Sequence, residues 1–157
     1  MAEIRIRETH GHTARTLVDP VAQQAYLADH HIGFEQWPIA RLDRDAMDAA
    51  PDRQAFILET FAVEVGRLLG ERGYVNADVI GLSAQTPNLD TILGKFDKEH
   101  RHSEDEVRFV VDGRGVFTIH SDVDDAVFDV EVQPGDLLMV PEGTWHWFTL
   151  CEDRAIT

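Results

Sequence analysis

The chain has 157 residues, which is the size of one ordinary domain and too small for two. Its 14 Lys and Arg residues are outnumbered by 29 Asp and Glu residues, and the net charge of −15 disfavours binding to nucleic acid or to an anionic membrane. A single cysteine, Cys151, rules out an internal disulfide, and neither a signal segment nor a transmembrane run is apparent, so we expect a cytoplasmic protein.

The first part of the chain, about residues 1–75, is predicted to be rich in helices. Asp19 and Pro20 give the clearest signal, because Asp is a favoured N-cap and Pro fits the first helical position. An apolar stripe indicates that the longest helix comes later. The predicted elements are a strand at 3–7, a helix from 20 to near 33, a strand at 33–37 and a helix at about 51–72.

The rest of the chain, about residues 76–157, is predicted to consist mainly of short strands. A strand at 76–83 and a short helix or turn at 88–95 come first, and turns such as Gly113-Arg114-Gly115 separate the later strands. Short strands at regular spacing favour a barrel or sandwich, with helices packed outside it. We therefore expect a mainly β fold with outer helices, in a single domain that covers residues 1–157.

Three histidines and one glutamate form the most informative pattern in the sequence: His100, His102, Glu106 and His146. Gly94 and Gly113 flank the first three at fixed spacing, and the turn Pro141-Glu142-Gly143 precedes the fourth. If residues 100–108 form a strand, alternate side chains share a face, so the first three residues point the same way. The turn at 141–143 would deliver the fourth residue from a second strand across that face.

Three imidazoles and one carboxylate suit a first-row transition metal, whereas calcium and magnesium prefer oxygen ligands. Four side chains on an octahedral ion leave two positions open, while a closed structural zinc site leaves none. The alternative is a surface histidine pair beside a solvated acid in the acidic run 103–106. A second His-x-His pair, His10 and His12, lacks the glutamate and the flanking glycines, so we predict a loop there.

Three further residues are expected to point into the candidate site, because each lies an even number of residues from a candidate ligand. Arg108 shares the predicted strand face, Phe148 lies two residues after His146, and Phe96 lies four residues before His100. A guanidinium can hold an enolate or carboxylate oxygen with forked donors, although arginine is also common in structural ion pairs. The two phenylalanines are as consistent with barrel core as with contacts to an apolar substrate group.

The two glycine-bounded motifs resemble the signature motifs of the cupin superfamily, whose members are double-stranded β-helix barrels. The one mismatch is Leu150, where asparagine is common. Residues 97–109 and 140–148 are more specifically similar to acireductone dioxygenases, through Glu99-His100-Arg101-His102 and Thr144-Trp145-His146-Trp147-Phe148. The resemblance therefore implies a cupin double-stranded β-helix barrel.

This resemblance also implies a site and a reaction. It implies one iron(II) or nickel(II) ion per chain, held by His100, His102, Glu106 and His146. The catalytic and substrate-binding residue would be Arg108, and the aromatic pocket residues would be Phe96 and Phe148. The implied reaction is cleavage by dioxygen of the acireductone 1,2-dihydroxy-3-keto-5-methylthiopentene in methionine salvage. The implied products are formate and 4-methylthio-2-oxobutanoate with iron, or formate, carbon monoxide and 3-methylthiopropionate with nickel.

Two other classes of metal-binding cupin stay open. A zinc-dependent sugar-phosphate isomerase would need basic pocket residues beyond Arg108, and a non-catalytic binding cupin usually lacks one or more of the ligands. Members of the resembled family continue past Arg154-Ala155-Ile156-Thr157 with a strand and a tail, so we expect the C-terminus to be truncated. The expected partners are the small-molecule acireductone and dioxygen, and we expect a monomer.

Overall fold

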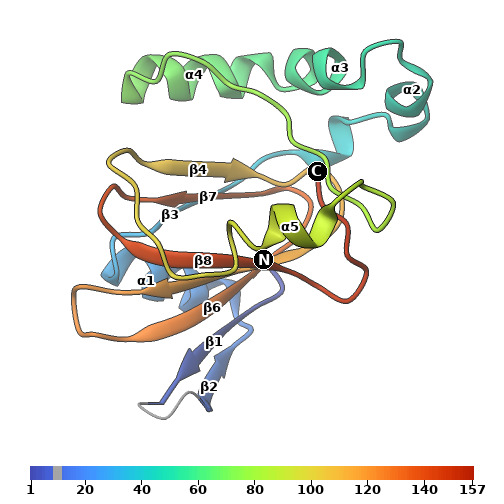
Figure 1. Cartoon of the computed structure of the whole chain (residues 1–157). Coiled ribbons are helices and arrows are strands. Elements are labelled where there is room, and N and C mark those ends of the chain that lie inside the picture. Colours follow the sequence, from blue (N-terminus) through green and yellow to red (C-terminus); the bar gives the residue numbers. More distant parts are fainter. Residues whose placement is uncertain (9–11) are drawn as a thin grey trace. The chain divides into compact units, whose positions relative to one another are not determined.

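The computed structural model describes residues 1–8 and 12–157, so His10 of the second His-x-His pair lies outside the described residues. The described chain forms two compact units (Figure 1). The first unit comprises Met1–Gln36 and Leu82–Thr157, and it contains the β-sheets. The second unit, Trp37–Gly81, contains helices. That both units belong to one domain stays a prediction.

A five-stranded antiparallel sheet forms one side of the first unit, with the order β2-β1-β6-β5-β8 among the described residues. Its strands are β1 (Glu3–Arg7), β2 (Thr13–Leu17), β5 (Gly115–His120), β6 (Val127–Val132) and β8 (Trp145–Leu150). Apolar residues alternate with polar ones in the central strand β5, where Phe117 and Ile119 belong to the core and Thr118 between them is polar, although it is buried too. This period of two places one face of the sheet against the core.

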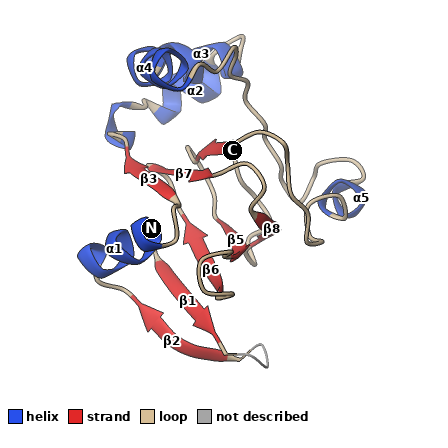
Figure 2. Cartoon of the chain, turned by 90° about the vertical axis from the view of Figure 1, so that its left-hand side faces the viewer, coloured by secondary structure: helices blue, strands red, loops and turns tan. Residues whose placement is uncertain are grey.

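A three-stranded antiparallel sheet forms the other side of the first unit, and Figure 2 labels two of its strands, β3 and β7. The order in the described chain is β3-β7-β4. Its strands are β3 (Gly33–Gln36), β4 (Glu106–Phe109) and β7 (Asp136–Val140). All five residues of the central strand β7 are buried, and the four after Asp136 are apolar, so this strand shows no alternation.

The hydrophobic core of the first unit joins both sheets and one helix. Phe128 and Val130 come from the five-stranded sheet, Leu138 and Val140 from the three-stranded sheet, and Leu27 from the helix α1 (Pro20–Asp29).

The predicted start of α1 is confirmed, because the Asp19 side chain accepts a hydrogen bond from the Ala22 N–H. The short helix α5 (Leu89–Leu93) confirms the element expected at 88–95.

Helix α1 ends earlier than expected, at Asp29 rather than near Gly33. His30 follows it and is buried, with Nδ1 2.7 Å from the Tyr26 carbonyl oxygen and Nε2 3.0 Å from Asp124. The contact with Asp124 is long-range and holds His30 just after the helix end. The chain then enters strand β3, whose predicted start at Gly33 is confirmed.

The second unit contains a 3-10 turn, η1 (Ile39–Arg41), followed by α2 (Arg44–Ala49), α3 (Arg53–Thr60) and α4 (Ala62–Arg72). The prediction of one helix over 51–72 was therefore wrong. Phe61 interrupts it with φ −109° and ψ 21°, and its buried ring packs 6.2 Å from the Trp37 ring centroid. Glu64 of α4 forms an ion pair with Arg41, 2.6 Å apart, which lowers the pKa of the glutamate.

The predicted strand at 76–83 was also wrong. Within this range the structure has an isolated bridge at Leu82, which exchanges backbone hydrogen bonds of 2.9 Å with Ile156. A strand requires a neighbouring strand along its length, and Ile156 supplies a partner at a single position. Ile156 also bridges to Gly113, so it links two separate stretches of the first unit.

The expected fold class is confirmed: the first unit consists of antiparallel sheets with the helices α1 and α5 outside them, and the second unit contains helices. Among the described residues, no helix has the length and apolar character that a membrane crossing requires.

Candidate metal centre

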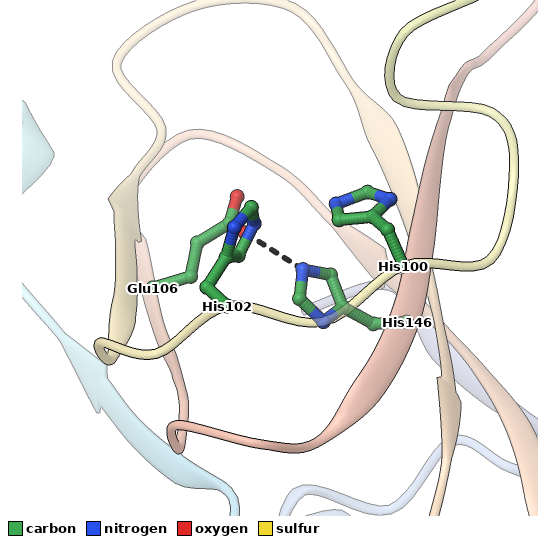
Figure 3. A group of neighbouring side chains, drawn as sticks. All are labelled: His100, His102, Glu106 and His146. Carbon is green, nitrogen blue, oxygen red and sulfur yellow. Dashed lines mark hydrogen bonds and ion pairs between the residues drawn. The ribbon is translucent and has the colours of Figure 1, made fainter.

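Four side chains converge between the two sheets: His100, His102, Glu106 and His146 (Figure 3). One candidate ligand atom from each residue lies within 4.8 Å of the others. Glu106 begins β4 of the three-stranded sheet, and His146 lies in β8 of the five-stranded sheet. Closure of the fold therefore brings together donors that are 40 residues apart.

The prediction that residues 100–108 form one strand was wrong. Strand β4 begins only at Glu106, and residues 101–105 are irregular. His100 instead forms an isolated antiparallel bridge with His146, with backbone hydrogen bonds of 2.9 Å in both directions. Two imidazoles on directly opposed residues share a face, which places their ring centroids 4.5 Å apart.

The turn before His146 forms a backbone hydrogen bond with His102. Gly143 donates its backbone N–H to the carbonyl oxygen of His102 at 2.8 Å, and it has a positive φ of 75°. Glu142 donates its N–H to the Asp105 carboxylate at 3.0 Å. The predicted role of residues 141–143 in bringing the second motif to the first is thus visible in the backbone contacts.

Backbone carbonyl groups orient two of the imidazoles. The Nδ1 atom of His100 lies 2.7 Å from the Lys98 carbonyl oxygen, and Nδ1 of His146 lies 2.8 Å from that of Thr144. Because a carbonyl oxygen only accepts hydrogen bonds, each Nδ1 carries a proton. Nε2 is then the atom available to a metal, and in His146 metal binding would displace the proton that Nε2 donates to Glu106 in the metal-free site. The donor set therefore fits a divalent transition metal.

Glu106 is held as a carboxylate. Its side chain is only 11% exposed, and burial by itself would raise its pKa. The hydrogen bond from His146 Nε2 at 2.7 Å and the charges of Arg108, His146 and His102 outweigh burial, and the pKa falls to about 2. The same contact raises the pKa of His146 against the opposing effect of its own burial. The site thus contains an anionic oxygen donor at neutral pH.

Arg108 lies beside these four residues. Its Nε is 3.2 Å from Oε1 of Glu106, and its side chain is about half exposed. The arginine therefore pairs with a candidate ligand rather than with a remote surface acid. One side of its planar guanidinium is used in this pair, and the group retains further N–H donors.

Phe96 and Phe148 are adjacent through their backbones, because the Phe148 N–H donates to the Phe96 carbonyl oxygen at 2.7 Å. Both side chains are partly buried. The Phe148 ring packs 4.8 Å from that of Phe117 and against the hydrophobic core. Phe148 thus joins the core to the strand that carries His146, and Phe96 is joined to that strand through its backbone.

Sequence reasoning missed the carbonyl oxygens of Lys98 and Thr144, because backbone groups leave no residue-type signal. It also missed Glu99 and Arg101, whose side chains contact His120 and Trp145. The available signal was their position in the sequence, since these two residues interleave with His100 and His102.

Comparisons with known proteins agree on one family. A family model described as the ARD/ARD' family matches residues 8–157. An acireductone dioxygenase from Exiguobacterium sibiricum is 45% identical over 136 residues, which cover 84% of this chain and 75% of that relative. One from Bacillus cereus is 40% identical over 159 residues, covering 99% of this chain and 91% of the relative.

A solved structure is also similar: an acireductone dioxygenase from Bacillus anthracis with a cadmium ion in its active centre. The TM-score is 0.90 at 40% identity, and the match covers 99% of this chain and 89% of the solved one. This likeness confirms the expected cupin fold.

Proposed function

Because the chain belongs to the ARD/ARD' family, we propose that it uses dioxygen to cleave the acireductone 1,2-dihydroxy-3-keto-5-methylthiopentene in methionine salvage. The observation that carries this proposal is the convergence of three imidazoles and one carboxylate within 4.8 Å. A site of this composition leaves open positions on an octahedral ion for a small substrate.

We assign the donors to His100, His102, Glu106 and His146, which would hold one iron(II) or nickel(II) ion per chain. The orientation of two imidazoles by carbonyl oxygens supports this assignment, as does the low pKa of Glu106. When bound, the ion would supply Lewis acidity and a template for the oxygen atoms of the substrate.

The remaining residues bind and orient the substrate in this proposal. Arg108 places a permanent positive charge next to Glu106, and its remaining donors would hold an anionic oxygen of the acireductone. Phe96 and Phe148 would offer apolar surface to the methylthioethyl group. Since β8 carries both His146 and Phe148, the strand would align the apolar end of the substrate with the metal centre.

All seven proposed site residues come from one chain, so the site requires no partner subunit. We therefore propose a monomer. The proposals of a single domain and of a cytoplasmic location rest on the length of the chain and on its single cysteine. The chemistry of the donor set does not separate iron(II) from nickel(II), because imidazole and carboxylate donors accept both ions.

The test is anaerobic reconstitution of the chelator-treated protein, separately with iron(II) and with nickel(II). After acireductone and dioxygen are added, formate, carbon monoxide and the two methylthio acids are measured. We expect formate and 4-methylthio-2-oxobutanoate from the iron form, and formate, carbon monoxide and 3-methylthiopropionate from the nickel form. Identical products would contradict the metal-dependent outcome, and no oxygen uptake by either form would contradict the dioxygenase assignment.

A further inference from the structure

The irregular segment that carries His100 and His102 has contacts on the face opposite the metal centre. Glu99 Oε1 lies 3.0 Å from Nδ1 of His120, and the Arg101 guanidinium lies 4.9 Å from the ring centroid of Trp145. His120 and Trp145 alternate along regular strands with the buried Ile119 and His146, so the side chains that contact them lie on the outer face of the sheet.

The two outer contacts meet on the five-stranded sheet. His120 of β5 and Trp145 of β8 are directly opposed cross-strand partners, next to the opposed pair Ile119 and His146. His120 is in turn held by Asp125, with Nε2 2.6 Å from Oδ1. Asp125 lies in the connection between β5 and β6, so the segment around His100 is tied to this hairpin.

This segment depends on such contacts because it lies outside the regular strands. Its backbone hydrogen bonds join Phe96 to Phe148, His100 to His146 and His102 to Gly143. Between these points the chain is irregular, and a stretch with few ladder hydrogen bonds opens more easily than a strand. Side-chain contacts at Glu99 and Arg101 restrain the residues on each side of His100.

We propose that Glu99, Arg101, His120 and Trp145, here called the outer clamp, are positioning residues that hold His100 and His102 in the geometry that binds the metal. This inference rests on the proposed metal centre and adds a role for residues that do not touch the metal. Each contact is partly exposed and individually weak, so the clamp adjusts affinity rather than determining the fold.

Nickel(II) affinity of the otherwise intact chain, measured by competition with a chromophoric chelator, tests the clamp. We expect Glu99→Ala and Arg101→Ala each to weaken nickel binding roughly three- to tenfold. This loss is at or below the smallest losses of metal affinity that follow removal of a group hydrogen-bonded directly to a metal ligand. Glu99→Gln should recover most of the affinity, because its amide oxygen still accepts a hydrogen bond from His120.

Asp125→Asn is the matched control. It removes the other carboxylate partner of His120, and with it the same amount of charge as Glu99→Gln. Asp125, however, lies outside the segment that carries His100 and His102. Asn also tolerates the positive φ of 57° at this position. We expect its nickel affinity to stay within about twofold of the wild-type value, since a lost surface charge pair has a small effect. Urea unfolding of the metal-free variants should give nearly unchanged stability, which separates positioning from general destabilisation.

Unchanged nickel affinity in both Glu99→Ala and Arg101→Ala would overturn the clamp. Equal weakening in Glu99→Ala, Glu99→Gln and Asp125→Asn would also overturn it, because the cause would then be lost negative charge. If Glu99→Ala fails to fold, His120→Ala breaks the same contact from the sheet and replaces it in these comparisons. A wild-type chain that binds no nickel would instead overturn the metal centre itself, a failure visible before any variant is made.

Discussion

His100 and His146 each donate a backbone N–H to the carbonyl oxygen of the other, with both distances 2.9 Å. This pairing directly opposes one histidine from each motif, so their imidazoles lie on one face of the bridge. The backbone thereby aligns two candidate donors before any metal binds.

Replacement of His102 or His146 by Ala should abolish stoichiometric metal binding in both cases, with different effects on stability. The His102 side chain is 48% exposed, so its loss should change the free energy of unfolding of the metal-free protein by less than about 0.5 kcal/mol. His146 is 2% exposed and hydrogen-bonded to Glu106, so its loss should cost about 1–3 kcal/mol. Metal analysis and urea unfolding measure the two effects, and full metal content in both variants would contradict the site.

Arg108→Lys should retain the metal while weakening substrate binding or slowing turnover. Lysine keeps the positive charge near Glu106 but loses the planar fork of donors. Steady-state kinetics with metal content determined on the same sample measures the effect, and Arg67→Lys in the second unit is a control for loss of a guanidinium from an exposed ion pair. Kinetics equal to the wild type would place Arg108 in a structural ion pair.

The stability of the metal-free protein should fall in acid because of Glu106. Its folded-state pKa is about 2 against an ordinary value of 4.5, so its contribution is complete above pH 4.5 and is lost as the pH falls towards 2. The shift corresponds to about 3 kcal/mol. Urea unfolding with a chelator present, repeated across this range, should show the decline in the wild type and a shallower one in Glu106→Gln. Parallel declines would contradict the assignment.

Burial lowers the pKa of His146, but the hydrogen bond with Glu106 outweighs it and raises the pKa. The stabilisation of the metal-free protein by this pair is therefore limited at alkaline pH. A histidine with a raised folded-state pKa stabilises the fold below its unfolded-state value and loses that contribution as the pH rises through the folded value. The pair should therefore stabilise the metal-free protein most between about pH 4.5 and 6.5.

Gly113→Ala should destabilise the protein more than Gly143→Ala. Both glycines have positive φ, 74° and 75°, which penalises any side chain. A Cβ at Gly113 would also lie 2.0 Å from the Ala155 carbonyl oxygen, whereas a Cβ at Gly143 would meet no described atom within 4 Å apart from its own chain neighbours. We expect about 1 kcal/mol for Gly143→Ala and at least 2 kcal/mol for Gly113→Ala from urea unfolding. Equal losses would show that the close approach carries no cost.

The sequence by itself determined the chemical types at the candidate site. His100, His102, Glu106 and His146 were predictable as a group because donor types and spacing are local properties of the chain. The helix start at Asp19 was predictable for the same reason, since an N-cap and its first turn lie within a few residues of each other. The strand at 33–37 and the short helix at 88–95 were also found, with small differences in their ends.

Only the tertiary structure decided how these donors meet. Glu106 and His146 come from different sheets, and the segment before Glu106 is irregular because its backbone pairs with β8 and the turn at 141–143 rather than with a neighbour along its length. The break at Phe61 and the missing strand at 76–83 have the same origin, because each depends on a partner distant in sequence. Local propensity indicates where a strand or helix can form, and long-range pairing and burial determine where it does.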